Sequence, residues 1–311
     1  MRKSFLLFSL VLPSVIFASC FAVIPQTTGF SSTHWEEQAV VNELLPGQTF
    51  AYQVATASLQ ISFDNNEFAV TNYHQLLGEK QSASLPLQVT YNNQSSAVFN
   101  YTLACGSLNR TISFPSSQTH YILFIFANLF EAFSIMDFTI SDFEFTNNFS
   151  QTAAAGGVDY FLFFFMPANE TSWLFLQSLA ENYTNLDWSD NYFVGKYDAS
   201  YYEQEAIAYL ELYTRGKLLP DTENLKISTG LLFGVNKTSG VVMGYRFKTS
   251  LKGEFKGYKV TCKTELYLKR EEFDLPELTL YQELKLVGGI GATVGVGLFM
   301  ALVVLVRKRK Q

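Results

Sequence analysis

The chain has 311 residues, of which 16% are charged and 16% are aromatic, including 29 Phe and 17 Tyr. An average soluble protein carries about 25% charged residues, and this apolar composition excludes a chain that is disordered over most of its length. All 28 acidic residues lie between Glu36 and Glu283, and residues 23–285 contain 16 basic residues, which gives this region a net charge of −12. Because phosphate binding requires clustered Lys and Arg, this balance argues against a nucleic-acid partner and against general attraction to anionic lipid.

Residues 1–22 have the pattern of a secretory signal peptide. Arg2 and Lys3 form a positive start, and the apolar run over residues 5–18 is too short to span a membrane. Small residues near Cys20 and Ala22 allow cleavage at either place. The run ending at Cys20 is also a weak lipobox, so lipidation of Cys20 stays an alternative.

Residues 23–285 are predicted to form a β-rich extracellular region with a mainly β (β-rich α+β) fold, built from antiparallel meander sheets. The length suits one large domain or two small ones. If the region has an internal joint, the stretch Gln-Thr-Ala-Ala-Ala-Gly-Gly at residues 151–157 is its best candidate.

The first half of this region contains one alternating segment and two continuous apolar runs. Apolar side chains alternate with polar ones over residues 97–105, and this predicts a half-buried strand with Asn100 on its wet face. The runs at 121–130 and 160–166 lack polar positions, so we predict strands that are buried on both faces.

One amphipathic helix is predicted over residues 169–185, with Asn169 and Thr171 as capping candidates. Its expected buried face consists of Trp173, Leu174, Leu176, Leu179, Ala180 and Tyr183.

An antiparallel meander is predicted before the C-terminal apolar run. Residues 227–235, 245–255 and 260–268 form its strands, joined by turns at 236–240 and 256–257. The interval 237–270 has nine basic and two acidic residues, a net charge of +7.

Three lysines on the wet face of this meander are candidate partner-binding residues: Lys248, Lys252 and Lys256. Their simplest interpretation is that they keep exposed strands soluble. The functional alternatives are a docking surface for an acidic glycan, for a lipid surface, or for another copy, because residues 23–200 have 3 basic and 16 acidic residues.

Residues 286–306 are predicted to be a transmembrane helix, because 21 uncharged residues precede Arg-Lys-Arg-Lys. The positive-inside rule then places residues 307–311 in the cytoplasm, which makes the chain a single-pass type I protein of the cell membrane. Gly291 and Gly295 form a small-xxx-small helix-packing motif that suits a homodimer, although glycine is common in spans generally.

Seven asparagines begin an Asn-x-Ser/Thr triplet without proline, and these candidate glycosylation sites agree with a cell-surface glycoprotein. They are Asn93, Asn100, Asn109, Asn148, Asn169, Asn182 and Asn236.

Cys105 and Cys262 are the only cysteines that remain if the signal peptide is removed beyond Cys20. Alternation points both inward, and an exported chain can keep disulfides, so we hypothesise one Cys105–Cys262 bridge. The alternative is two separate buried thiols.

No sequence motif indicates a catalytic, cofactor or metal site. The three histidines lie in different segments, and neither HExxH nor GxSxG occurs. Glu203 and Glu205 are a possible carboxylate pair, but a solvated strand face explains them as well. We therefore expect a protein that is not an enzyme and has no cofactor.

Five features follow one another along the chain: the segment at residues 45–54, the helix around Trp173 after Met166-Pro167, Gly244-Tyr245, Leu275-Pro276, and the glycine-bearing apolar run with its basic end. In this order of features the sequence resembles archaeal choice-of-anchor surface proteins (choice-of-anchor S-like). Such a resemblance implies a cell-surface location and no known activity.

The expected function is adhesion, envelope structure or ligand binding by a non-catalytic ectodomain, with the membrane, other surface proteins or glycans as partners. Two alternatives stay open, an ectoenzyme with a spatially assembled site and an apolar-ligand or lipid carrier. In a carrier, the phenylalanines of the apolar runs would line an empty pocket: Phe124, Phe126, Phe163, Phe164 and Phe165.

Overall fold

The computed structural model describes residues 44–64, 66–70, 86–95, 98–106, 108–118, 120–122, 124–125, 162–184, 193–218, 225–255 and 257–280. The predicted signal peptide, the joint at 151–157 and the predicted span at 286–306 lie outside these residues. Among the residues that are described, no helix has the length and apolarity needed to cross a membrane.

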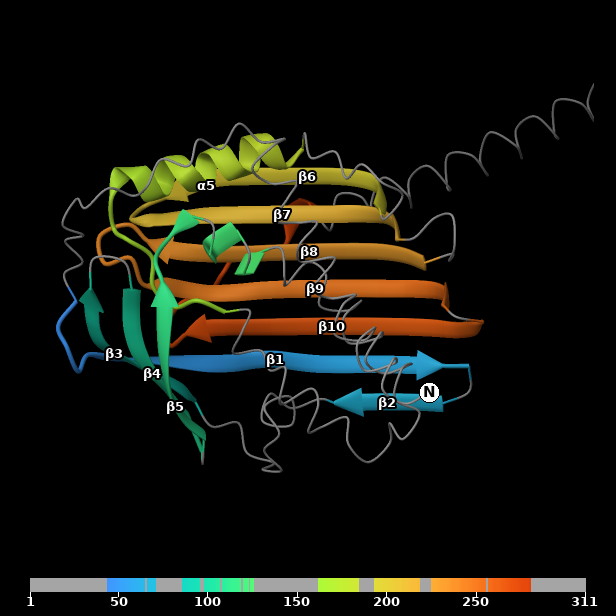
Figure 1. Cartoon of the computed structure of the whole chain (residues 1–311), viewed down its shortest axis with the longest axis horizontal. Helices are drawn as coiled ribbons and strands as arrows, with labels where there is room; N and C mark the ends of the chain where they lie inside the picture. Colours follow the sequence, from blue (N-terminus) through green and yellow to red (C-terminus); the bar gives the residue numbers. More distant parts are fainter. Residues whose placement is uncertain are drawn as a thin grey trace, which may run out of the picture.

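Ten strands form one antiparallel sheet (Figure 1), which confirms the mainly β fold class. The strand order is β5-β4-β3-β1-β10-β9-β8-β7-β6, and β2 pairs with β1 beside this path. The strands are β1 (Thr49–Phe63), β2 (Asn66–Val70), β3 (Leu87–Ser95), β4 (Val98–Cys105), β5 (Leu108–Pro115), β6 (Phe193–Gln204), β7 (Ile207–Leu218), β8 (Leu225–Asn236), β9 (Val242–Phe255) and β10 (Tyr258–Arg270).

The first long strand and the last strand are neighbours in the middle of the sheet. β1 pairs with β10 from Tyr52 to Phe63. On its other edge β1 is shared, since Thr49–Tyr52 pair with β3 and Leu59–Phe63 pair with β2. The two halves of the described chain therefore belong to one continuous sheet.

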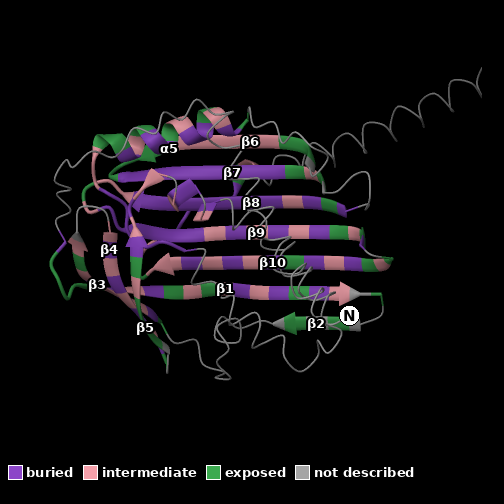
Figure 2. Ribbon diagram, in the orientation of Figure 1, coloured by how far each residue is buried: buried purple, intermediate pink, exposed green. Residues whose placement is uncertain are grey.

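The predicted C-terminal meander is confirmed as β8, β9 and β10. In β9 the buried residues alternate with half-buried or exposed ones from Tyr245 onward (Figure 2). The side chain of Asn236 accepts hydrogen bonds from the Thr238 and Ser239 amides, both at 3.0 Å, and this closes the β8–β9 turn. Gly257 has a φ of +82°, which suits glycine in the β9–β10 turn.

The aromatic run ending at Met166 differs from its prediction. Residues 162–166 are fully buried, but among described residues they form only one isolated bridge, between Phe165 and Val241. This buried segment lies between strands β3–β5 and the central strands of the same sheet, because its rings contact Tyr101 and Phe114 as well as Phe233. Its three phenylalanines contact rings of different strands: the Phe163 ring contacts Tyr245 of β9, and the Phe164 and Phe165 rings both contact Tyr101 of β4.

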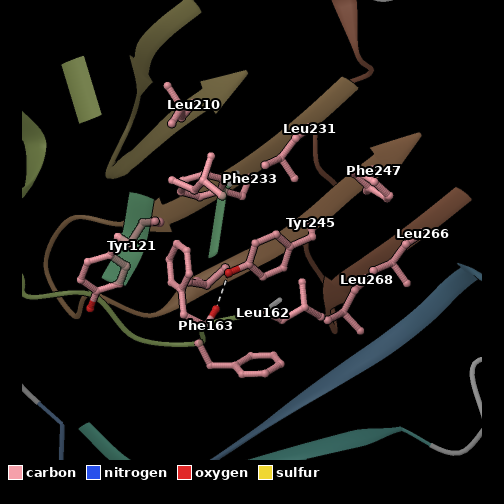
Figure 3. Packing of buried hydrophobic residues seen from close by; sticks show 14 of the residues in the cluster. Tyr121, Leu162, Phe163, Leu210, Leu231, Phe233, Tyr245, Phe247, Leu266 and Leu268 are labelled. Carbon is pink, nitrogen blue, oxygen red and sulfur yellow. Dashed lines mark hydrogen bonds between the residues drawn. The ribbon is translucent and has the colours of Figure 1, made fainter. Parts of the chain in front are cut away.

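Tyrosine hydroxyls satisfy backbone carbonyls around this buried segment. Tyr245 donates to the Phe163 carbonyl (Figure 3), and Tyr121 donates to the Phe165 carbonyl at 2.9 Å. Tyr52 donates to the Val242 carbonyl at 2.6 Å. Buried backbone groups without such partners would be costly, so these hydroxyls allow an irregular segment inside the core.

The run at 121–130 is helical where it is described, and not a strand. Residues 118, 120–122 and 124–125 are helical, and Tyr121, Ile122 and Ile125 are buried. Ser117 starts this turn, since its carbonyl accepts from the Tyr121 amide at 3.2 Å. The sequence prediction gave the Phe and Ile content more weight than the serines that precede it.

The predicted helix is confirmed as α5 (Glu170–Tyr183), which packs on β6 and β7. Asn169 caps it by accepting from the Ser172 amide at 2.9 Å. Thr171 is exposed and does not cap. Leu176, Leu179, Ala180 and Tyr183 are buried as predicted, but Phe175 is buried where Leu174 was expected, and Leu174 is 56% exposed.

Candidate functional site

The sheet has an outer face opposite the aromatic core, and a row of lysines crosses it. Lys217 of β7 pairs directly with Lys226 of β8, and Lys226 pairs directly with Lys252 of β9. All three side chains are exposed. Adjacent strands lie about 4.8 Å apart, so the lysine row brings three like charges close together.

A second set of cations lies two residues away from this row in the strand direction, on β6, β7 and β10. Lys196 pairs with Arg215, and Lys263 pairs with Ser250. All three of these cations are exposed as well. We call the six residues together the cationic face: Lys196, Arg215, Lys217, Lys226, Lys252 and Lys263.

Among the described residues, few carboxylates lie around the cationic face. Asp198 follows Lys196 along β6, and Glu254 lies directly opposite Lys259 in the β9–β10 pair. Glu265 forms an ion pair with Lys248 at 2.9 Å. In the part of the chain that the structure describes, none of the six residues of the cationic face has an ion pair.

The three lysines proposed from the sequence have different positions. Lys252 belongs to the cationic face, Lys248 borders it and is neutralised by Glu265, and Lys256 lies outside the described residues. Sequence reasoning missed Lys217 and Lys226, because only the pairing register places them beside Lys252. For Lys226 a signal was available in the sequence, because it stands between the buried Leu225 and Ile227.

Residues 271–280, which we call the anchor segment, also pack on the outer face. Leu275 and Leu278 are 3% and 2% exposed and contact a cluster that includes Tyr209 and Leu232. Gly244 makes room for this contact, since a Cβ built there would lie 3.1 Å from Leu275 Cδ1.

Polar contacts fix both ends of the anchor segment. Near its start, Lys269 Nζ lies 2.6 Å from Asp274 Oδ1, and this hydrogen bond holds the pKa of Asp274 below its ordinary value. In the middle, the Arg246 guanidinium donates to the Leu275 carbonyl at 3.0 Å. At its end, the buried Glu211 carboxylate accepts from Thr279 Oγ1 at 2.7 Å and from the Leu280 amide at 2.9 Å.

The candidate glycosylation sites lie in varied surroundings, and Asn148 is outside the described residues. Asn93 and Asn109 are exposed. Asn100 Nδ2, the atom that a glycan would occupy, donates to Asn93 Oδ1 at 2.6 Å. Asn182 Nδ2 donates to the Ser178 carbonyl at 2.8 Å. Asn169 and Asn236 use Oδ1 for their local turns and are half-buried.

Cys105 and Cys262 are both buried, and no disulfide joins them. Cys105 follows Ala104, which pairs through Gln88 of β3 to Ala51 of β1. Cys262 pairs with Ile61, ten positions further along β1, which corresponds to about 30 Å of strand. A disulfide needs Cα atoms within about 7 Å, so the structure replaces the proposed bridge with two separate thiols.

The groups considered for catalysis are engaged locally. Glu203 forms an ion pair with Lys237, which lowers the pKa of Glu203, and Glu205 lies exposed in the β6–β7 turn. His120 Nδ1 lies 2.6 Å from Ser117 Oγ, three residues away, and burial lowers the pKa of His120. Among the described residues, no group of three potential metal ligands gathers. Gly291 and Gly295 lie outside these residues.

Comparisons with known proteins add no relative: no family model, no curated protein and no solved structure matches this chain. The resemblance to choice-of-anchor surface proteins therefore stays a hypothesis that rests on the sequence alone.

Proposed function

We propose that this chain is a single-pass type I protein of the cell surface, whose non-catalytic ectodomain binds an anionic ligand through the cationic face. The topology rests on the sequence signals at residues 1–22 and 286–306. The binding function rests on one observation, the lysine row formed by Lys217, Lys226 and Lys252.

The position of the lysine row supports binding over simple solubility. Lysines that prevent aggregation are most useful on edge strands. β8 and β9 are interior strands of the sheet, with paired neighbours on both sides. Directly opposed like charges cost stability, so their presence on interior strands suggests a role that offsets this cost.

Two alternative functions receive less support. Phe163, Phe164 and Phe165 are each 1% exposed and contact other rings, so they fill the core and do not line an empty pocket. Phe124 packs on Phe114, and Phe126 lies outside the described residues. The ectoenzyme alternative loses its motivating carboxylate pair to the Glu203–Lys237 ion pair.

Salt elution from an anionic resin tests the binding function. The full chain, solubilised in a non-ionic detergent, should bind immobilised dextran sulfate and elute only at raised salt. The double variant Lys226→Gln/Lys252→Gln should elute at clearly lower salt. The control Arg110→Gln/Lys237→Gln removes the same charge elsewhere and should elute like the parent protein. Co-elution of both double variants would show that only net charge matters.

A further inference from the structure

We infer that the anionic ligand of the cationic face is the phosphate headgroup layer of the membrane in which this chain is anchored. This inference rests on the proposed function and names the ligand of the same site. Its starting point is that the anchor segment and the cationic face share the outer face of the sheet.

Residues of β7 relate the position of the anchor segment to that of the cationic face. Glu211 binds the Leu280 amide, and Arg215 and Lys217 point to the same face four and six residues further along the strand. At about 3.3 Å per residue, these cations begin about 13 Å from the point where the anchor segment ends and extend to about 20 Å.

The length of the remaining chain limits how far the membrane can be. The predicted span begins at Leu286, six residues after Leu280. Six residues reach about 20 Å even when fully extended. The headgroup layer itself is several ångströms thick on each side of the hydrocarbon core. The outer face of the sheet is therefore tethered within reach of the headgroups.

Charge complementarity then selects the ligand. The ectodomain is acidic overall, with a net charge of −12, but six exposed cations are collected on the face beside the exit of the chain. A basic side chain near an anionic bilayer strengthens binding roughly fivefold, and Debye screening limits the effect to about 8–10 Å in ordinary salt. Free polyanions lack this tether.

Lysine labelling in lipid nanodiscs tests the inference with the unmodified full chain. The protein is reconstituted into discs of phosphatidylcholine alone and into discs with about a third phosphatidylglycerol, and lysines are acetylated and quantified by mass spectrometry. Labelling of Lys217, Lys226 and Lys252 should fall severalfold in the anionic discs and recover in 0.5 M salt. Lys237, outside the face, should label equally in both.

The outcomes separate the two proposals. Equal labelling of the lysine row in both discs, together with protection by added dextran sulfate, would overturn the lipid ligand and leave the proposed function standing. If the chain did not stay in the discs after alkaline washing, the predicted membrane anchor would be contradicted, and with it both proposals. If the lysine row were protected from acetylation only at a high ratio of protein to discs, the cationic face would be assigned to contacts between copies. This result would also contradict the lipid ligand.

A variant provides an independent check. In Lys226→Gln/Lys252→Gln, the protection of Lys263 by anionic discs should be lost, because the local charge density falls. In Arg110→Gln/Lys237→Gln the protection of Lys263 should persist. Loss of protection in both variants, or in neither, would contradict attraction by the cationic face.

Discussion

Lys226 has an electrostatic position that few surface lysines share. It lies between Lys217 and Lys252 in the middle of the sheet, with a like charge directly opposite on each side. Cross-strand pairs contribute roughly 0.2–1 kcal/mol relative to neutral ones, and like charges act against stability. This residue should therefore weaken the fold while it strengthens the cationic face.

Replacing Lys226 with Gln should raise the free energy of unfolding by about 0.2–1 kcal/mol. Urea denaturation of the solubilised chain measures this change through the transition midpoint. Lys263→Gln is the matched control, because Lys263 faces the neutral residues Ser250 and Gln60 and should give no gain. A destabilised Lys226→Gln protein would mean that the lysine row is not repulsive.

Gly244 and Gly234 are cross-strand partners with different tolerance of a side chain. A Cβ at Gly244 would lie 2.4 Å from the Leu268 carbonyl oxygen, and the φ of +157° there is one that residues with a side chain rarely adopt. Because this oxygen belongs to the backbone of β10, moving it away costs more free energy than moving a flexible side chain. At Gly234 the nearest atoms belong to the Tyr209 ring, at 3.0 Å, and a ring can move.

Gly244→Ala should therefore destabilise the protein by about 1–3 kcal/mol, the usual cost of overpacking. Gly234→Ala should cost clearly less. Thermal unfolding of both variants, compared with the parent protein, measures the difference. Equal losses at the two positions would contradict the assignment of the clash to the β10 backbone.

Among the elements, alternation predicted the strands of the meander well, because each buries one face only. Sequence patterns failed where a segment is buried all round. Residues 162–166 have the composition of a central strand, but tyrosine hydroxyls from β9 and from the turn at 120–122 satisfy carbonyls that a sheet would otherwise pair. Such distant donors leave no periodic signal near the segment. The error in the buried face of α5 reflects a similar limit, since Leu174 and Phe175 are both apolar and only Phe175 is buried.

Glu211 connects the sheet to the anchor segment, and replacing it tests this connection. Glu211→Gln keeps an acceptor oxygen for the Leu280 amide and turns its amide donor toward the Thr279 hydroxyl, which can accept. Two charge-assisted hydrogen bonds at a buried position thereby become weaker neutral ones, at a cost of about 1–3 kcal/mol. Hydrogen exchange should rise at the amides of residues 275–280, and little in β8.

Thr279→Val is the control for Glu211→Gln, because it removes one donor and retains the Leu280 amide contact. It should give a smaller rise in exchange over the same residues. Unchanged exchange in Glu211→Gln would show that the packing of Leu275 and Leu278 alone holds the anchor segment.

At the scale of the whole molecule, the candidate site was only partly accessible from the sequence. Lys252 was identified by alternation within one strand, whereas Lys217 lies 35 positions earlier and joins it only through Lys226. A patch of this kind depends on the register of three strands. The disulfide prediction was wrong for the same reason. Alternation shows that Cys105 and Cys262 point inward, but it does not show how far apart they lie along the strands of the sheet.

Protease added to intact cells tests the proposed topology. If residues 286–306 span the membrane, the bulk of the chain should be removed and a short fragment ending at Gln311 should remain with the membrane. Permeabilised cells serve as the control, because there the basic tail also becomes accessible. Complete protection of the chain in intact cells would be incompatible with an external ectodomain.

The pairing of β1 with β10 determines when this protein can finish folding. A ribosome or export channel delivers β1 early, but its central partner follows only after some two hundred further residues, since Tyr52 pairs with Arg270. Such distant pairing makes folding slow. During synthesis one edge of β1 stays open as a template for mispairing, so the chain depends on prompt completion or on protection by a chaperone. A stalled or truncated product that ends before β10 would lack its central strand pair and would be prone to aggregate.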